Sequence, residues 1–555
     1  MEKIYGKTTG LKASQIRQLQ NLYRRKISGK EVITRELTRR LAFLSYEIKR
    51  QIALLITRKG EIAFVVVGDH RQIFIPDLGR YRLGKGRLKG LRCVHTHVGG
   101  EPLSREDISD LVLLGLDFMV CVEVREGGVP GALSFAHILP KNVEGEGWRI
   151  SRVPDIGHLD VDFPALIQSL ENELARVGGR EDLKRRDRAV LVGISTGPVW
   201  KARESLEELR ELALSSDLEV VDTVLQSVSR PNARFFIGKG KLRELVLRCL
   251  QTGSNLLVFD NELTPAQVRT LTDLTELRII DRSQLILDIF ARRAVTREGK
   301  IQVELAQLKY LLPRLATKNT AMSRLTGGIG GRGPGETKLE INRRRVRERI
   351  ARLKRELREI GRQRINRRRL RNARRLPVVS IVGYTNAGKS TLLNTLTRSN
   401  VFVEDRLFAT LDPSSRRLRF PREREIIITD TVGFIRDLPG DLMDAFAATL
   451  EELHDADLLL HVVDASHPRM EEQVRSVARI LERLGLTAIP ILMVLNKSDL
   501  LEPGEAARLA RTWDGVAVSA LDRGSLLPLL SKMEALLFSS KEEKGLACIG
   551  GEPLQ

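Results

Sequence analysis

The sequence has few cysteines, no long apolar run and no leader-like start. Its four cysteines are scattered and form no Cys-x-x-Cys pair, so a disulfide framework is not indicated. No apolar run approaches the roughly 18 residues that cross a bilayer, and the first residues lack the apolar core of a signal peptide. We therefore expect a reduced protein of the cytoplasm with no transmembrane segment.

The chain is too long, at 555 residues, for a single hydrophobic core, and we expect three or four domains. A hydrophobic content of 42% is sufficient to form such cores. The 92 Lys and Arg against 71 Asp and Glu give a formal charge of +21. This excess favours a polyanionic partner, either nucleic acid or an anionic membrane.

A phosphate-binding loop is indicated at residues 383–390, Gly-Tyr-Thr-Asn-Ala-Gly-Lys-Ser, between an apolar run and a helix-like stretch. Glycines let backbone N–H groups wrap around phosphates, and the helix N-terminus adds a favourable field. Lys389 would reach the β- and γ-phosphates, and the Ser390 hydroxyl would bind Mg²⁺. The predicted nucleotide contacts here are Gly383, Asn386, Ala387, Gly388, Lys389, Ser390 and Thr391.

Two further segments follow with the spacing of a GTPase. Thr410 lies 20 residues after Ser390, where a threonine can close onto Mg²⁺ and the γ-phosphate. A strand at 425–430 ends in Asp-Thr-Val-Gly, in which Asp430 would hold Mg²⁺ through water and the Gly433 N–H would contact the γ-phosphate. The predicted catalytic residues are Lys389, Thr410 and Gly433, and the predicted magnesium ligands are Ser390, Thr410 and Asp430.

The base would be recognised by Asn-Lys-Ser-Asp at 496–499 and Val-Ser-Ala at 518–520. The Asp499 carboxylate can accept hydrogen bonds from guanine N1–H and N2–H₂, whereas adenine offers an unprotonated N1 there. This predicts GTP rather than ATP in this domain. The predicted base contacts are Asn496, Lys497, Asp499, Ser519 and Ala520.

Phe434 stands after Gly433, where many GTPases carry a glutamine that orients the attacking water. A phenyl ring cannot hydrogen-bond water, so we expect slow intrinsic hydrolysis and a partner that completes the site.

A basic helical hairpin is predicted upstream. From 343 to 375 the chain has 17 Lys or Arg, 3 Glu and no aromatic residue, so this stretch carries +14 of the total charge. Such one-sign density indicates contact with RNA phosphates rather than base stacking. Residues 327–335 contain six glycines and form the predicted tip. Apolar residues at helical spacing form two seams that can pack antiparallel, at 305, 308, 312 and 315 and at 346, 350, 353, 357 and 360.

Earlier in the chain, strands and helices alternate from 189 to 281, which predicts a small parallel α/β unit. Its basic, glycine-bearing loop at 229–241 either binds phosphate or an RNA backbone, or is a solvated turn. Before it, residues 11–55 are predicted to be helical, and strands are predicted at 61–67 and 73–75.

The segment Cys-Val-His-Thr-His at 93–97 places His95 and His97 on one face of a strand, where both can bind one metal. Asp107 is the predicted third Zn²⁺ ligand, and Glu61 the predicted general base for a bound water. Alternatively, no metal binds and Ser104 is the N-cap of a helix with Asp107 in its first turn.

This arrangement resembles the JAB/MPN metalloprotease motif. It departs from that motif because six residues rather than seven separate His97 from Ser104, and because Val98 replaces a proline. A metallohydrolase or RNA-remodelling factor regulated by its GTPase domain is therefore the alternative function.

The phosphate loop, the segments Phe-Ala-Thr-Leu-Asp-Pro from 408 and Asp-Thr-Val-Gly-Phe-Ile from 430, and the glycine tip closely resemble the HflX GTPases over about residues 189–540. The resemblance implies a GTPase that binds the large (50S) ribosomal subunit and its rRNA and, with GTP, splits or rescues stalled or idle 70S ribosomes. It also implies possible ATP binding by the middle unit. A monomer is expected.

The fold class expected is multidomain α/β. We predict an N-terminal α+β extension (1–185), a small α/β domain (186–297), the basic hairpin (298–372), a P-loop GTPase domain (373–540) and a tail (541–555).

Overall fold

The computed structural model describes residues 3–76, 78, 81, 88–140, 142, 146–177, 187–233, 235–275, 277–315, 338–372, 376–397, 414–420, 424–431, 433–435 and 451–546. The chain forms two compact units, the first comprising residues 1–206 and 218–280, the second 207–217 and 281–555. Each unit is described by itself, and the domain boundaries predicted above stay a prediction.

The first unit begins with a seven-stranded mixed sheet in the order β1-β3-β2-β4-β5-β6-β7. Its central strand β4 is wholly buried although it carries Arg92, His95, Thr96 and His97. Buried polar groups need partners, and Thr96, for example, bonds to the Ser45 hydroxyl at 2.7 Å. The strands are β1 (Ile4–Gly6), β2 (Ile52–Thr57), β3 (Ile62–Val67), β4 (Leu91–His97), β5 (Phe118–Val124), β6 (Pro130–Ile138) and β7 (Trp148–Val153).

The helices that accompany this sheet are α1 (Ala13–Gln20), α2 (Arg35–Ile48), α3 (Arg105–Leu113) and α4 (Phe163–Val177), with short 3-10 turns at Asn21–Arg24, Glu126–Gly128 and Ile156–His158. Two expectations were wrong here. Residues 52–57 form a strand because α2 ends at Lys49 in a left-handed conformation and a continuous apolar run follows, which is buried in the sheet. Residues 73–75 are not a strand.

A second, four-stranded sheet in the first unit has the order β11-β10-β8-β9, and β8 pairs in parallel with both β9 and β10. This agrees with the alternating pattern of the sequence. The elements are β8 (Arg188–Ser195), α5 (Val199–Ser215), β9 (Glu219–Ser227), α6 (Lys239–Thr252), β10 (Leu256–Phe259), α7 (Pro265–Thr275) and β11 (Arg278–Asp281). The part of α5 from residue 207 onward, Glu208 included, belongs to the second unit, as does Asp281.

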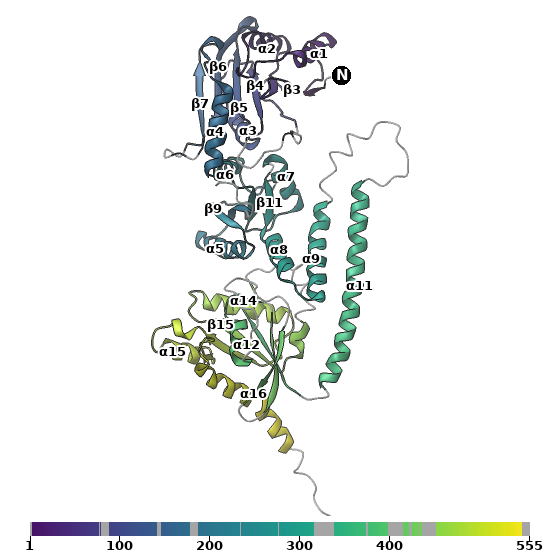
Figure 1. Cartoon of the computed structure of the whole chain (residues 1–555), viewed down its shortest axis with the longest axis vertical. Helices are drawn as coiled ribbons and strands as arrows, with labels where there is room; N and C mark the ends of the chain where they lie inside the picture. The colour runs from purple at the N-terminus through teal and green to yellow at the C-terminus, as the bar shows by residue number, and fades with distance from the viewer. Residues whose placement is uncertain are drawn as a thin grey trace, which may run out of the picture. The chain divides into compact units, whose positions relative to one another are not determined.

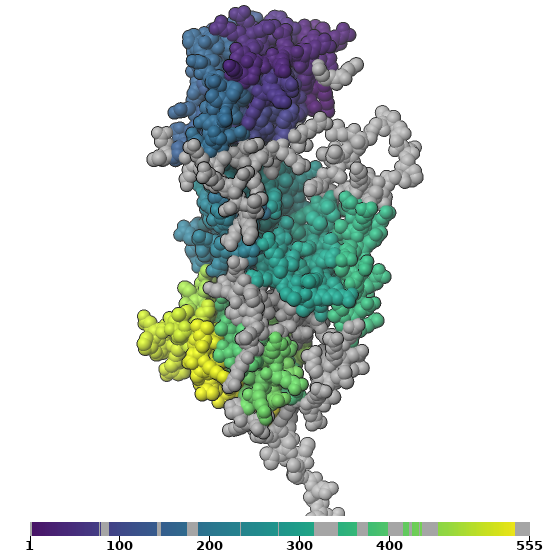
Figure 2. Space-filling model, in the orientation of Figure 1, coloured from purple at the N-terminus to yellow at the C-terminus, as the bar shows by residue number. Residues whose placement is uncertain are grey.

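The second unit contains the helices α8 (Arg282–Arg293), α9 (Arg297–Leu315) and α11 (Lys338–Asn372) (Figure 1). α9 and α11 pack along the predicted apolar seams, with Ile301, Leu305 and Leu353 buried between them. The space-filling view shows their surfaces in contact (Figure 2). Arg349 on α11 also pairs with Glu304 on α9 at 2.7 Å. The glycine-rich tip lies outside the described residues.

The remainder of the second unit is a six-stranded sheet, β13-β14-β12-β15-β16-β17, parallel except for the pair β13 and β14. Its elements are β12 (Val378–Gly383), α12 (Lys389–Thr397), β13 (Ser414–Arg419), β14 (Glu425–Asp430), β15 (Leu458–Asp464), α14 (Met470–Arg483), β16 (Ile491–Asn496), α15 (Glu505–Thr512), β17 (Val516–Ala517) and α16 (Leu527–Leu546), with 3-10 turns at Glu451–Asp455, Ser498–Leu500 and Gly524–Leu526.

Within the described ranges, no helix has the length and apolar character required to cross a membrane.

Candidate functional site

The predicted phosphate loop joins β12, which lies between β14 and β15, to the start of α12. Its turn needs unusual backbone angles, with φ of 61° at Asn386 and 87° at Gly388. A Cβ atom on Gly388 would lie 2.2 Å from the Asn496 amide nitrogen, so only glycine allows this close approach. The loop therefore has the tight path that phosphate binding through backbone N–H groups requires.

Lys389 is buried at the first position of α12, and its Nζ donates to the Tyr384 carbonyl at 2.6 Å. Burial lowers the pKa of this ammonium to about 8, and the Asp430 charge partly opposes the shift. A buried cation of this kind is stabilised by negative charge, such as the phosphates of a nucleotide.

Ser390 and Asp430 come together from α12 and from the end of β14. The Ser390 hydroxyl donates to Asp430 Oδ2 at 2.6 Å, and the Thr431 N–H donates to Asp430 Oδ1 at 2.9 Å. Asp430 is fully buried. A hydroxyl and a carboxylate beside a phosphate loop are the oxygen ligands that suit Mg²⁺.

Gly433 and Phe434 lie against the same loop. The Phe434 N–H donates to the Gly383 carbonyl, and the Thr385 N–H donates to the Phe434 carbonyl. A Cβ atom on Gly433 would lie 2.9 Å from Lys389 Nζ. The Phe434 side chain is only 3% exposed, so the position after Gly433 is a packed ring rather than a group that could hold water.

Asn496 connects the loop to the predicted base-binding segment. Its amide nitrogen donates to the Ala387 carbonyl and its amide oxygen accepts from the Ala520 N–H, both at 2.8 Å. Lys497 pairs with Asp464 at 2.7 Å, and Asp499 is exposed. The Ser519 N–H bonds to the Ser525 hydroxyl at 3.0 Å. Asn496 therefore holds the phosphate and base segments together.

Two sets of contacts in this site could not be predicted from a sequence motif. The first is the pair of bonds from the Asn496 side chain to Ala387 and Ala520. The second is a 2.5 Å hydrogen bond from the Tyr384 hydroxyl to Glu208 on α5, which also pairs with Arg282 on α8. Both depend on residues far apart in sequence. Thr410, by contrast, lies outside the described residues, so its predicted role stays a prediction.

Comparisons with known proteins agree with this geometry. The family described as "50S ribosome-binding GTPase" matches residues 378–497, "GTP-binding GTPase Middle Region" matches 293–371, and "GTP-binding GTPase N-terminal" matches 203–291. The chain is 48% identical over 365 residues to "GTPase HflX" of Caldanaerobacter subterraneus, covering 65% of this chain and 83% of that protein.

The chain belongs to the HflX family of GTPases. It is also 48% identical over 305 residues to "GTPase HflX" of Escherichia coli strain K12, covering 55% of this chain and 72% of that protein. Among solved structures, a GTP-binding protein of Sulfolobus solfataricus in complex with GDP shares 26% identity at a TM-score of 0.37, covering 64% of this chain and 99% of that one.

Three predictions are thereby confirmed: the HflX resemblance, the multidomain α/β fold class with a P-loop GTPase domain, and GTP hydrolysis as the activity. GTP is the substrate that this family membership implies.

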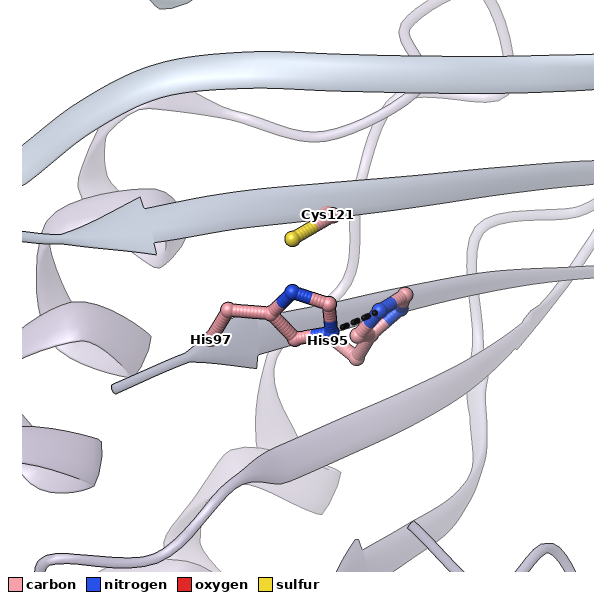
Figure 3. A group of neighbouring side chains, drawn as sticks. All are labelled: His95, His97 and Cys121. Carbon is pink, nitrogen blue, oxygen red and sulfur yellow. Dashed lines mark hydrogen bonds between the residues drawn. The ribbon is translucent and has the colours of Figure 1, made fainter. Parts of the chain in front are cut away.

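This HflX GTPase also has a polar cluster in its N-terminal sheet. His95 and His97 on β4 and Cys121 on β5 place their ligand atoms within 4.8 Å of one another, and all three are buried (Figure 3). The two histidine Nε2 atoms are 3.2 Å apart. Asp107 on α3 lies 3.3 Å from His95 Nε2 and 3.5 Å from His97 Nε2. The three predicted metal ligands are therefore brought together, and a thiol joins them.

The prediction that Ser104 is the N-cap of a helix is also confirmed. Ser104 is the N-cap of α3, and its hydroxyl and N–H both donate to Asp107 Oδ2 at 2.7 Å. Capping and the approach of Asp107 to the histidines coexist, because Oδ2 accepts from Ser104 and still lies 3.5 Å from His97 Nε2, while Oδ1 lies 3.3 Å from His95 Nε2.

Burial dominates the electrostatics of this cluster. It raises the pKa of the Cys121 thiol well above its ordinary value, and the Asp107 charge adds to the effect. Burial and the neighbouring His95 lower the pKa of His97. Burial also acts to raise the pKa of Asp107, but His95 and the Ser104 hydroxyl outweigh it and keep that pKa below its ordinary value. The Cys121 thiol donates to the Glu101 carbonyl at 3.7 Å, and the same carbonyl lies 3.0 Å from His97 Nδ1.

Glu61 is not in the cluster, and its predicted role as general base was wrong. β2 pairs with β4 so that Ala53 is opposite His95, whereas Thr57 is opposite Leu91. Glu61 lies beside Thr57, whose N–H donates to the Glu61 carbonyl, and its side chain is exposed. The four residue steps from Ala53 to Thr57 separate the two ends by about 13 Å. A water held by the histidines is out of reach of this carboxylate.

Proposed function

We propose that this HflX GTPase binds the large (50S) ribosomal subunit through rRNA and, in its GTP state, splits or rescues stalled or idle 70S ribosomes. Its family carries a domain described as a 50S ribosome-binding GTPase. The observation that carries the proposal is the cationic surface of α11, which belongs to the same compact unit as the nucleotide site.

The basic side chains of α11 face solvent on the side away from its packed seam. The exposed ones in the part of α11 whose side chains are described are Arg344, Arg345, Arg347, Arg352, Lys354, Arg355, Arg358 and Arg362. Two of these arginines pair with acidic residues of the same helix, Arg344 with Glu348 and Arg352 with Glu356. Phosphates of structured RNA are the partner that such a surface suits.

The nucleotide site supports a partner-activated cycle. We propose that Lys389, Thr410 and Gly433 contact the γ-phosphate, that Ser390 and Asp430 hold Mg²⁺, and that Asp499 selects guanine. With Phe434 buried, the chain supplies no water-orienting group at that position, so docking on the ribosome would complete the site. ATP binding by the middle unit and the monomeric state stay predictions.

The proposal is tested by sedimentation of 70S particles with this protein and GTP, a non-hydrolysable GTP analogue or GDP. We expect subunits to separate with the first two and not with GDP. Intact 70S peaks under all three conditions would contradict the proposal.

A charge-reversal pair isolates the role of α11. We expect Arg345→Glu with Arg347→Glu to weaken 50S binding by about 10-fold or more at physiological salt, because phosphate contacts dominate such affinity. The control is Arg475→Glu with Arg479→Glu on α14, an equal charge change at exposed positions of the GTPase domain. Equal losses in both variants would mean that only net charge matters, and would remove α11 from the proposal.

A further inference from the structure

The cluster in the N-terminal sheet belongs to the first unit, whereas the GTP site belongs to the second, and the proposed ribosomal role does not use the cluster. The sequence predicted two histidines and Asp107 as ligands, with a water activated by Glu61. The structure removes that base and adds the Cys121 thiol, which changes what the cluster can do.

We propose that His95, His97, Asp107 and Cys121 form a closed, four-ligand site for Zn²⁺ that stabilises the N-terminal domain and does not activate water. The ligands would be both histidine Nε2 atoms, one Asp107 oxygen and the Cys121 thiolate. Two imidazoles, a carboxylate and a thiolate are all ligands that Zn²⁺ accepts, and a tetrahedral set without an open position is typical of structural rather than catalytic zinc.

The donor separations are close to those of a zinc site for three of the four groups. Zinc–nitrogen bonds of about 2.0–2.1 Å place neighbouring donors roughly 3.3 Å apart. The separations found are 3.2 Å between the two Nε2 atoms, 3.3 Å from His95 Nε2 to Asp107 Oδ1 and 3.5 Å from His97 Nε2 to Asp107 Oδ2. Cys121 is opposite His95 in the parallel pairing of β4 and β5, which puts both side chains on the same face of the sheet (Figure 3). Its ligand atom lies within 4.8 Å of those of both histidines, so zinc binding would draw the sulfur and one Asp107 oxygen inward onto a single ion.

Neighbouring groups already orient two of these ligands. His97 Nδ1 lies 3.0 Å from the Glu101 carbonyl, to which it can donate, leaving the Nε2 lone pair directed at the cluster. Asp107 is fixed by two bonds from Ser104. Such outer partners are a regular feature of metal sites, because they set the tautomer and direction of each ligand.

Two groups of the cluster have weak or no partners. His95 Nδ1 is buried and has no hydrogen-bond partner within the described structure, and the Cys121 thiol makes a 3.7 Å contact with the Glu101 carbonyl. Zinc would replace this contact by a stronger bond to sulfur. On binding, the Cys121 S–H bond breaks, a zinc–sulfur bond forms and the proton leaves to solvent.

The test uses the full chain, stripped with a chelator and reloaded with Zn²⁺ or Co²⁺. We expect one metal per chain and, with Co²⁺, the intense near-ultraviolet charge-transfer band of a cobalt–thiolate bond. Cys121→Ser should abolish the band and weaken metal binding more than about 100-fold, the upper end for loss of an outer partner. Cys249→Ser is the matched control, because it removes a buried thiol on α6, and it should change neither.

Two results would overturn the proposal. One is less than stoichiometric metal in the wild-type chain. The other is bound Co²⁺ with no thiolate band, which would leave the three-ligand site with a water that the sequence predicted. X-ray absorption fine structure at the zinc edge of the wild-type protein shows directly whether a sulfur atom is bound to the zinc. This measurement needs no variant, so misfolding of Cys121→Ser cannot obscure the result.

Discussion

The GTP site and the histidine–cysteine cluster are built in opposite ways. The predicted phosphate loop is eight consecutive residues, and its predicted partners follow in a fixed order along the sequence. The cluster takes its groups from β4, β5 and α3, and its fourth member is separated from His97 by 23 residues and belongs to another strand. A site formed by consecutive residues can be recognised from the sequence. A site whose residues lie on different strands depends on the register in which those strands pair.

The largest expected effect tests whether the two sites are independent. Lys389→Ala should lower GTP hydrolysis by about 10³- to 10⁵-fold, the range for loss of a cation that stabilises the transferring phosphoryl group. His95→Ala with His97→Ala should leave nucleotide affinity and basal hydrolysis unchanged. Phosphate release under single-turnover conditions measures both. A parallel loss in the histidine variant would mean that the regions are coupled and would break the comparison.

The same contrast explains which predictions the sequence could support. Lys389, Asp430 and Asp499 follow one another in the order typical of a GTPase. This order predicted the nucleotide and the fold class, because each of these residue types has one physical role at its position in such a domain. His95 and His97 indicated a shared face, since strands alternate sides. Cys121 could not be found, because its pairing opposite His95 requires the β4–β5 register. Glu61 was misplaced for the same reason: a strand pattern does not tell which end of the neighbouring strand a residue meets.

Asn496 is the part of the GTP site that most resembles the cluster, since its bonds reach Ala387 and Ala520 across the domain. Asn496→Ala leaves a buried carbonyl and a buried N–H unpaired, which costs about 1–3 kcal/mol each. We expect weaker GTP binding by at least about 10-fold and a lower unfolding midpoint.

Asn496→Asp is the matched variant, because it keeps the acceptor for the Ala520 N–H but replaces the donor to the Ala387 carbonyl by a carboxylate oxygen that repels it. Equilibrium binding of a fluorescent guanine nucleotide compares the two. An alanine variant that binds as tightly as wild type would show that the phosphate and base segments hold their positions without this bridge.

A smaller effect contrasts a solitary buried histidine with the paired ones. Burial, together with the Lys389 charge, lowers the pKa of His461 on β15 to about 4. The unfolded chain, with an ordinary pKa near 6.5, therefore binds the proton more tightly than the folded domain. The contribution of the neutral His461 to the free energy of unfolding is present above about pH 6.5. It is lost as the pH falls toward 4, by about 2 kcal/mol near pH 5.

Urea unfolding at pH 7 and pH 5 checks this expectation. His461→Gln should remove that part of the pH dependence, whereas His454→Gln, at an exposed position, should keep it. An unchanged pH dependence in the His461 variant would assign the acid sensitivity to other groups, the cluster histidines included.

The central claim is that the guanine nucleotide controls how strongly the basic hairpin holds ribosomal RNA. The most direct measurement is the dissociation constant for purified 50S subunits with a non-hydrolysable GTP analogue and with GDP, at one fixed salt concentration. The account predicts binding at least about 10-fold tighter with the analogue, a coupling of about 1.4 kcal/mol. Equal affinity with the two nucleotides would contradict it.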